Sequence, residues 1–293
     1  MAVIETGLGG RLDATNVITP LASIITNVGF DHTDLLGNTL REIASEKAGI
    51  IKKSVPVIIG ESSEEYNDVF EAKAAVGRSR VIFAEASFRY VEHNADEQRQ
   101  HIILERMCDG RIYDLELDLA GEYQRKNAVT AAAAIHKLHD SSPLTISRRA
   151  FIEGFAKAAS STGLAGRWQT LSEKPWIVCD TGHNAHGISY VASMLKDVAQ
   201  RYNRQIIVIG FAREKNIDEV LPLLPREAYY IFTQANVSRA MSAEELAEQA
   251  ATAGLQGEIQ PSVAEAMTRA KELAAEEDMI FVGGSNFVVA EVL

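Results

Sequence analysis

Short apolar runs alternate with segments of helical periodicity along most of the chain, and this alternation limits the folds open to it. Runs rich in Val and Ile are typical of strands buried on both faces, whereas the segments between them have the spacing of amphipathic helices. Strands and helices that alternate in this way fold as a mostly parallel sheet covered by helices. The sequence therefore predicts an α/β protein.

The first half of the chain interrupts this alternation once. Strands are expected at residues 2–4, 21–28, 55–59 and 80–83, and helices at 40–47, 64–76, 123–139 and 147–158. Thr39 is placed to cap the first of these helices. Three shorter segments between residues 88 and 117 have alternating apolar side chains and predict a small antiparallel patch.

A second domain is expected after the small polar segment at residues 160–163. With 293 residues the chain exceeds the usual size of one hydrophobic core, which favours two domains, 1–162 and 163–293. In the second domain, strands are expected at 176–179, 205–209, 229–232 and 279–282, and helices at 185–201, 217–224, 243–253 and 263–275. This order predicts a Rossmann-like, doubly wound domain.

Composition excludes several classes of protein. The formal net charge is −11 and neither Lys nor Arg forms a dense run, so no nucleic-acid partner is expected. No apolar stretch approaches the roughly 20 residues of a membrane-spanning helix, and the N-terminus lacks the pattern of a signal peptide. Cys108 and Cys179 have neither a disulfide nor a zinc spacing. We expect a cytoplasmic monomer without a membrane partner.

Two residues follow predicted strands at positions suited to a metal ion. Glu5 ends the first apolar run, and His32 follows the second strand in Asn27-Val28-Gly29-Phe30-Asp31-His32. Neighbouring parallel strands end at the same ligand-binding edge of a sheet, so the two side chains converge if these strands are neighbours. A carboxylate there can hold Mg²⁺ directly or through water. The alternatives are an exposed strand-end acid and a hydrogen-bonded structural histidine.

A glycine cluster, Gly7-Leu8-Gly9-Gly10, follows Glu5 and is similar to the start of a dinucleotide-binding turn. The third position of that motif is Leu12 instead of Gly or Ala. A helix must also begin at such a turn, whereas Asp13-Ala14-Thr15-Asn16, followed by Pro20, continues as a loop. The sequence therefore disfavours an NAD-dependent enzyme.

Lys47 lies in the segment Glu46-Lys47-Ala48-Gly49-Ile50 on a predicted helix. The ordinary interpretation is a solvated helix lysine. Near Mg²⁺ in a partly desolvated site, its pKa would fall and its amine could take up CO₂ as a carbamate. Carbamylation would turn a cation into an anion that a metal ion can bind.

Three further positions could bind a nucleotide. Arg167 follows the expected domain boundary, where its guanidinium could clamp a phosphate, and the alternative is a surface salt bridge. Asp180-Thr181-Gly182-His183-Asn184 occupies the first strand-to-helix turn of the second domain, where doubly wound folds place ligand-binding groups. Asn127 could read an adenine edge or cap a helix.

These segments closely resemble the folylpolyglutamate synthase/dihydrofolate synthase family of Mur ligases, over essentially the whole chain. The most specific matches are the segments 5–16, 31–33, 36–37 and 46–50. Weaker support comes from Gln124 with Asn127, Gly166-Arg167, Asp180 with His183-Asn184, and Gly284-Ser285.

The resemblance implies an ATP-dependent ligase that adds L-glutamate to dihydropteroate or folate through an acyl phosphate. It implies that Glu5, His32 and a carbamylated Lys47 serve Mg²⁺, and that Asn127, Arg167 and Asp180 contact ATP. It further implies that Leu12, Asp13 and Ala14 contact the pterin-containing substrate, while His183 and Asn184 organise the nucleotide and the incoming amino acid. The implied fold is a Mur-ligase central ATPase domain followed by a Rossmann-like ligase domain.

The sequence departs from the family pattern in three places. The family usually has Asp-Gly-Ala-His-Asn-Pro where this chain has residues 180–185, and Tyr123 stands where a His is usual. The family also carries a phosphate loop ending in Gly-Lys-Ser upstream of the Glu5 strand, and this sequence contains no Gly-Lys dipeptide. Such a loop cradles phosphates with backbone N–H groups and a lysine. We therefore expect a truncated central domain and a chain that is inactive alone; the alternatives are a Mur-type ligase with another acceptor and a non-catalytic nucleotide-binding fragment.

Overall fold

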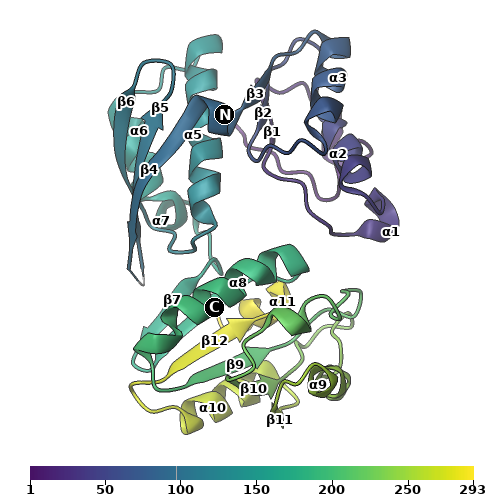
Figure 1. Cartoon of the computed structure of the whole chain (residues 1–293), viewed down its shortest axis with the longest axis vertical. Coiled ribbons are helices and arrows are strands. Elements are labelled where there is room, and N and C mark those ends of the chain that lie inside the picture. Colours follow the sequence, from purple (N-terminus) through teal and green to yellow (C-terminus); the bar gives the residue numbers. More distant parts are fainter. Residues whose placement is uncertain (97) are drawn as a thin grey trace. The chain divides into compact units, whose positions relative to one another are not determined.

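The computed structural model describes residues 1–96 and 98–293, which form two compact units (Figure 1). Unit 1 comprises Met1–Asn94, Gln100–Leu117 and Tyr123–Lys157. Unit 2 comprises Ala95–Arg99, Asp118–Glu122 and Ala158–Leu293. The last change of unit, between Lys157 and Ala158, comes shortly before the boundary expected between residues 162 and 163.

Unit 1 contains a parallel sheet of three short strands, in the order β1 (Ser23–Ile25), β2 (Val57–Ile59) and β3 (Val81–Phe83). All three residues of β2 are buried, because this strand has a neighbour on each side. Helices α2 (Leu40–Ala48) and α3 (Asn67–Gly77) add Ile43 and Phe70 to the core beside this sheet. Thr39 caps α2 in a capping box with Glu42, as the sequence predicts.

The second sheet of unit 1 is antiparallel, in the order β4 (Phe88–Ala95), β5 (Gln100–Arg106) and β6 (Arg111–Leu117). Alternate side chains of β5 and β6 are buried, the period expected when one face of a sheet is covered. Helices α5 (Gln124–Ser141) and α6 (Arg148–Ala156) share a core with this sheet and with Ile58 of β2. Helix α5 therefore serves both sheets of unit 1 (Figure 1). The remaining short helices of unit 1 are η1 (Ala14–Val17), α1 (Thr33–Leu36) and α4 (Ala84–Ser87), and α7 (Ala158–Thr162) opens the last segment of unit 2.

Unit 2 is built on one six-stranded sheet in the order β11-β10-β9-β12-β8-β7. Its strands are β7 (Gln169–Glu173), β8 (Trp176–Asp180), β9 (Gln205–Ile209), β10 (Tyr229–Phe232), β11 (Gly257–Ile259) and β12 (Met279–Gly283). All pairs are parallel except β7 with β8. The helices are α8 (Ala185–Val198), η2 (Ala199–Arg201), η3 (Leu221–Leu223), α9 (Ala243–Thr252), α10 (Val263–Leu273) and α11 (Asn286–Ala290). The two units confirm the predicted α/β class with its mostly parallel sheets and antiparallel patch.

Two predicted elements are wrong, and the segment after Asp13 that was expected to continue as a loop contains the short 3-10 helix η1, which Asp13 caps. Residues 2–4 form no strand, and Val3 is 88% exposed, because β1 pairs with β2 alone among the described strands and an apolar run without a neighbour cannot form a ladder. The helix predicted at 217–224 is reduced to η3. Pro222 lies in its first turn, where proline can start a helical turn, and Pro225 follows closely and cannot extend it.

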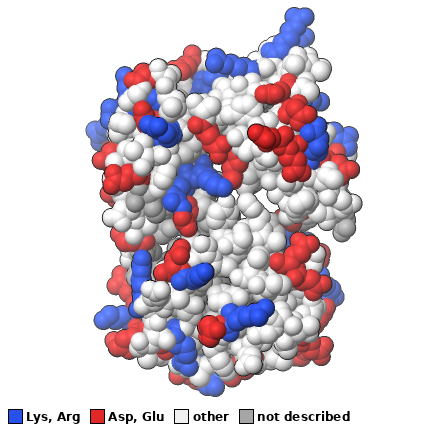
Figure 2. Space-filling model, in the orientation of Figure 1, with Lys and Arg blue, Asp and Glu red and all other residues white. Residues whose placement is uncertain are grey.

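The surface adds two observations. On the face drawn in Figure 2, Lys and Arg side chains are scattered among Asp and Glu instead of forming one basic patch. Within the part of the chain that the structure describes, no helix combines the length and the apolar character needed to cross a membrane.

Candidate functional site

The glycine-rich loop of residues 7–16 packs directly on the C-terminal end of α2. The Arg11 N–H donates to the carbonyl oxygen of Glu46 at 3.0 Å. A Cβ atom on Gly49 would lie 2.3 Å from the Cα of Arg11, and one on Gly10 would lie 2.7 Å from Cγ2 of Ile50. These approaches leave no room for a side chain at Gly49, so the loop and the helix end touch backbone against backbone.

Side chains fasten the same contact. The Asn16 amide donates to the carbonyl oxygens of Arg11, at 3.2 Å, and Gly49, at 3.1 Å. The Arg11 guanidinium forms an ion pair with Glu46 at 2.9 Å, and the Lys52 ammonium donates to the carbonyl oxygen of Asn16 at 2.6 Å. The loop is thus attached to α2 and to the segment that follows it.

Asp13 organises the inside of the loop. Its carboxylate accepts from the backbone N–H groups of Gly7 and Leu8, at 2.8 and 3.1 Å, and from the backbone N–H and hydroxyl of Thr15, at 2.9 and 2.5 Å. These hydrogen bonds, those from Thr15 above all, lower the pKa of Asp13 to about 2. Leu12 is 82% exposed beside this carboxylate, and Ala14 is exposed as well.

Asp31, His32 and Lys47 form the second feature of unit 1. The backbone N–H of His32 donates to the Asp31 carboxylate at 3.0 Å, and the Nε2 atom of the His32 ring lies 3.8 Å from the same carboxylate. Burial lowers the pKa of Lys47 on α2, and the charge of Asp31 opposes this shift. The acidic group of Asp31 therefore acts on both predicted metal-site residues, and the lowered pKa is the property that carbamylation of Lys47 requires.

Glu5 is the predicted metal ligand that the structure does not join to this group. Its side chain is exposed, and it makes no hydrogen bond or ion pair with any residue that the structure describes. Among the side chains that the structure describes, no three from His, Cys, Asp or Glu are grouped as a ready metal site. The group of Asp31, His32 and Lys47 nevertheless suits a divalent cation, because it combines a carboxylate and an imidazole with an amine that can become a carbamate.

Asn127 lies in the first turn of α5. Its amide donates to the side-chain oxygen of Gln124 at 2.8 Å, and Gln124 itself is buried. The alternative that Asn127 caps the helix is wrong, because Tyr123 holds the capping position and Asn127 is already helical. The Gln124–Asn127 pair fixes the direction of the Asn127 side chain on the exposed side of the helix.

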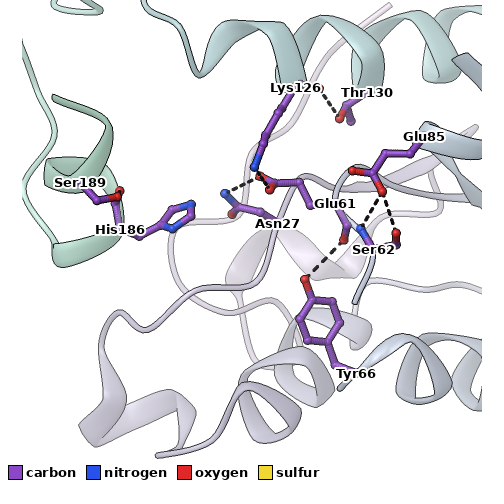
Figure 3. A network of polar contacts seen from close by, with 9 residues as sticks. All are labelled: Asn27, Glu61, Ser62, Tyr66, Glu85, Lys126, Thr130, His186 and Ser189. Atoms are coloured by element: carbon purple, nitrogen blue, oxygen red, sulfur yellow. Dashed lines mark hydrogen bonds and ion pairs between the residues drawn. The ribbon is translucent and has the colours of Figure 1, made fainter. Parts of the chain in front are cut away.

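Sequence reasoning missed a polar network at the ends of β1 and β2 (Figure 3). Glu61, two residues after β2, forms an ion pair with Lys126 of α5 at 2.5 Å and accepts from the Asn27 amide at 3.5 Å. Two sequence features come nearest to predicting this network. Glu61 follows a buried strand, as Glu5 was expected to do, and Lys126 adjoins Asn127. The pairing of residues 65 positions apart has no spacing pattern from which it could be predicted.

In unit 2, Asp180 organises the turn that leaves β8. Only 2% of this residue is exposed, and its carboxylate accepts from the backbone N–H groups of Trp168, at 2.8 Å, and Gly182, at 2.7 Å. The Arg167 guanidinium donates to the hydroxyl of Thr181 and to the carbonyl oxygen of Gly166. Arg167 forms no ion pair with any residue described in the structure, so the surface salt-bridge alternative is wrong.

His183 and Asn184 complete the same turn. The Nδ1 atom of His183 lies 3.0 Å from the carbonyl oxygen of Thr181 and is placed to donate to it. Asn184 caps α8, because its side-chain oxygen accepts from the N–H of Gly187 at 2.8 Å. Asp180, His183 and Asn184 therefore lie in or beside the turn that leaves β8, and Arg167, which precedes β7, is hydrogen-bonded to that turn through Thr181.

Comparison with protein families assigns both parts of the chain. Residues 1–135 match the model described as "Mur ligase middle domain". Residues 166–286 match the model described as "Mur ligase, glutamate ligase domain". The chain belongs to the Mur ligase family. The first match contains the predicted site residues of unit 1 and the second contains those of unit 2.

Several relatives of this Mur ligase chain are named as folylpolyglutamate or dihydrofolate synthases. It is 32% identical over 297 residues to the dihydrofolate synthase/folylpolyglutamate synthase of Escherichia coli, a match that covers 100% of this chain and 64% of that protein. It is similar to the structure of E. coli FolC in complex with DHPP and ADP, with a TM-score of 0.84, 31% identity and coverage of 98% and 64%. It is also similar to the Yersinia pestis enzyme complexed with AMPPNP and Mn, with a TM-score of 0.79, 27% identity and the same coverage.

The Mur ligase chain is shorter than these relatives. It spans 47%, 64% and 56% of the length of three folylpolyglutamate or dihydrofolate synthases, from Lacticaseibacillus casei, E. coli and Bacillus subtilis. The relatives therefore contain a substantial part that this Mur ligase chain does not match.

Proposed function

We propose that this chain is part of an ATP-dependent amide ligase that adds L-glutamate to dihydropteroate or folate. The observation that carries the proposal is the partly buried Lys47, whose pKa is lowered, on the end of α2 that contacts the glycine-rich loop in a Mur ligase middle domain. An ordinary helix lysine keeps its ammonium group in water, so burial would not lower its pKa. The names of the relatives support the folate substrates, and the glutamate ligase domain supports the amino acid.

Lys47 would become a metal ligand by reaction with CO₂. The neutral amine attacks the carbon of CO₂, a C–N bond forms, one N–H proton leaves to solvent, and a carbamate anion results. Glu5, His32 and the carbamate of Lys47 would hold Mg²⁺, which neutralises charge on the transferring phosphoryl group when it is bound. The lowered pKa of Lys47 favours this reaction, because only the unprotonated amine is a nucleophile.

The proposed reaction has two steps. A carboxylate oxygen of dihydropteroate or folate attacks the γ-phosphorus of ATP, and ADP leaves. The neutral amine of glutamate then attacks the acyl carbon, a C–N bond forms, one N–H proton leaves to solvent, and phosphate leaves with the former acyl oxygen. Asn127 would contact the adenine, Arg167 and Asp180 would also contact ATP, and His183 and Asn184 would organise the nucleotide and the incoming amino acid.

The loop of residues 7–16 would bind the pterin-containing substrate. Leu12 and Ala14 are exposed and offer apolar contact to a flat ring. Asp13 would act mainly by holding the loop in shape, because its carboxylate already accepts four hydrogen bonds from Gly7, Leu8 and Thr15.

We further propose that these 293 residues are inactive alone. They contain no Gly-Lys dipeptide, and phosphate loops of this kind rely on that lysine and on glycine N–H groups to grip the nucleotide. This absence favours the second candidate function, a nucleotide-binding fragment without turnover. The two candidates differ in whether dihydropteroate-dependent phosphate release from ATP occurs once a phosphate loop is supplied.

Two measurements test the proposal. With ¹³C-labelled bicarbonate, ¹³C NMR should give a carbamate signal in the wild-type chain that disappears in Lys47→Ala and persists in the control Lys137→Ala. Titration calorimetry with Mg-ADP should give saturable binding that Lys47→Ala weakens. A chain that binds no Mg-ADP would refute the ligase assignment, and a missing carbamate signal would remove Lys47 from the proposed metal site.

A further inference from the structure

The carboxylate of Glu61 joins two segments of unit 1 that are far apart in the sequence (Figure 3). One oxygen accepts from the Asn27 amide at 3.5 Å, and the other lies 2.5 Å from the Lys126 ammonium. Asn27 stands in the loop that leaves β1, and Lys126 stands in the first turn of α5. A single side chain therefore contacts both segments.

The backbone fixes Glu61 without help from its carboxylate. The ladder between β1 and β2 continues past the strands. The Gly60 N–H donates to the carbonyl oxygen of Ile25 at 2.8 Å, and the Glu61 N–H donates to the carbonyl oxygen of Thr26 at 2.9 Å. The next turn is held separately, since the Ser62 hydroxyl donates to the Glu85 carboxylate at 2.7 Å (Figure 3). Removal of the Glu61 charge should therefore leave the position of its backbone unchanged.

Helix α5 approaches this strand end very closely. A Cβ atom on Gly60 would lie 2.3 Å from the carbonyl oxygen of Thr26 and 2.5 Å from the hydroxyl of Thr130. Thr130 lies one helical turn after Lys126 on the same face, and its hydroxyl donates to the Lys126 carbonyl oxygen at 2.9 Å. The contact at Gly60 sets how near the helix lies, and the ion pair to Glu61 sets how its first turn is oriented.

Each partner of Glu61 precedes a residue of the proposed site. Asn27 opens the loop that leads to Asp31 and His32, on the proposed metal side. Lys126 is followed by Asn127, which the proposed function places on the adenine side. Glu61 is thus the link within unit 1 between the two groups that would hold opposite ends of Mg-ATP.

We infer that Glu61 is a positioning residue for nucleotide binding, which keeps the first turn of α5 in register with the loop that leaves β1. This inference rests on the proposed function. Glu61 touches neither the nucleotide nor the metal ion; it acts through Asn27 and Lys126. Because Lys126 is 48% exposed and Glu61 is 21% exposed, the ion pair contributes little to global stability, so its purpose is local geometry.

The experiment measures Mg-ADP affinity of the full chain by titration calorimetry. Glu61→Gln and Lys126→Met should each raise the Kd by about threefold to tenfold, the range in which residues without ligand contact commonly act. Lys126→Arg should stay near the wild-type value, because a guanidinium can keep the ion pair. The exchanged pair Glu61→Lys with Lys126→Glu should regain most of the affinity that either single change loses.

The matched control is Glu153→Gln, which removes the exposed ion pair between Arg149 and Glu153 on α6 of the same unit. It should leave the Kd unchanged. Melting temperatures should be equal for all variants, which separates positioning from a loss of stability. Unchanged affinity in Glu61→Gln would overturn the inference, as would an equal loss in Glu153→Gln.

Hydrogen exchange separates failure of this inference from failure of the proposed function. Without nucleotide, the amides of residues 128–131 should exchange faster in Glu61→Gln than in the wild type and in Glu153→Gln. If the wild-type chain binds no Mg-ADP, the proposed function fails, and faster exchange then supports the role of Glu61 in positioning α5. If the wild type binds no Mg-ADP and exchange is also unchanged, both proposals are overturned.

Discussion

The turn after β8 in unit 2 and the glycine-rich loop region of unit 1 hold their site residues in different ways. In unit 2, Asp180 is buried and shares its carboxylate between two backbone N–H groups, so the turn is complete within its own hydrogen bonds. In unit 1, Glu5 is exposed and the apolar surface is incompletely covered. Among the described residues, eleven of the twenty exposed large hydrophobic side chains lie in residues 1–35.

This difference teaches that the proposed site residues of each unit are held in place by different contacts. The turn in unit 2 is preorganised by the fold of that unit, and its geometry should persist in isolation. The loop region in unit 1 is fastened on one side, to α2, and presents exposed apolar groups on the other. Substitutions should therefore damage folding most in unit 2 and ligand binding most in unit 1.

The largest effect is expected for Asp180→Ala. The change leaves the N–H groups of Trp168 and Gly182 without their acceptor in a buried place, so the free energy of unfolding should fall by about 3 kcal/mol. Asp180→Asn should cost less, because it keeps one acceptor oxygen. Denaturant unfolding followed by Trp fluorescence measures both, and a loss below about 1 kcal/mol for Asp180→Ala would contradict a preorganised turn.

A smaller loss is expected for Gly49→Ala in unit 1. The added Cβ would lie 2.3 Å from the Cα of Arg11, so the glycine-rich loop must move away from α2, at a cost of about 2 kcal/mol. The control is Gly154→Ala within α6, where nothing lies within 4 Å of the added atom. That change should stabilise by about 0.5–1 kcal/mol, as usual in a helix. Equal effects of the two changes in thermal unfolding would show that the loop is not fastened to α2.

Acidification should weaken unit 1 through His136. Arg106 donates to its Nδ1 atom at 3.1 Å, so the neutral ring carries its proton on Nε2, which has no hydrogen-bond partner among the described residues. Burial lowers the pKa of His136, and the charge of Arg106 lowers it further. The unfolded chain takes up this proton near pH 6.5 while the folded chain resists it, so the contribution of His136 is complete above about pH 6.5 and is lost as the pH falls below that value.

The variant His136→Phe isolates this effect. Its ring can occupy the aromatic cluster of Phe88, Tyr113 and Phe151 without a titrating group. Urea unfolding at pH 7.5 and pH 5.5 should show a smaller drop in stability for His136→Phe than for the wild type. The same drop in both proteins would place the acid sensitivity elsewhere.

The smallest effect on folding is expected for Leu12→Ala. Its side chain is 82% exposed, so the free energy of unfolding should change by less than about 0.5 kcal/mol. Under the proposed function the same change should weaken binding of dihydropteroate, measured by fluorescence titration. A loss of stability without a loss of binding would reverse the comparison between the two regions.

Much of the fold follows from the sequence, because the strands of the parallel sheets are short apolar runs between helical segments. Residues 2–4 show the limit, since an apolar run forms a strand only beside a partner, and pairing is not written in local pattern. The strands β7 and β11 were not predicted for the opposite reason: each has a pairing partner but few apolar residues. Their sequences are Gln-Thr-Leu-Ser-Glu and Gly-Glu-Ile, and both strands lie at the edges of the sheet.

The candidate site was predictable to a similar degree. The sequence locates Lys47, His32 and the turn at Asp180, because each follows a strand or lies in a motif. It does not locate Asp31 as the group that acts on both His32 and Lys47, nor Glu61 as the partner of Lys126. These relations join residues brought together only by the packing of helices on the sheet.

The seating of Arg11 against Gly49 has one further consequence. Because the glycine-rich loop and the end of α2 share backbone contacts, a displacement of one should be transmitted to the other. A molecule that pushes on the tip of that loop would therefore shift the helix that bears Lys47. Under the proposed function, binding of the acceptor at the loop would therefore shift the amine of Lys47.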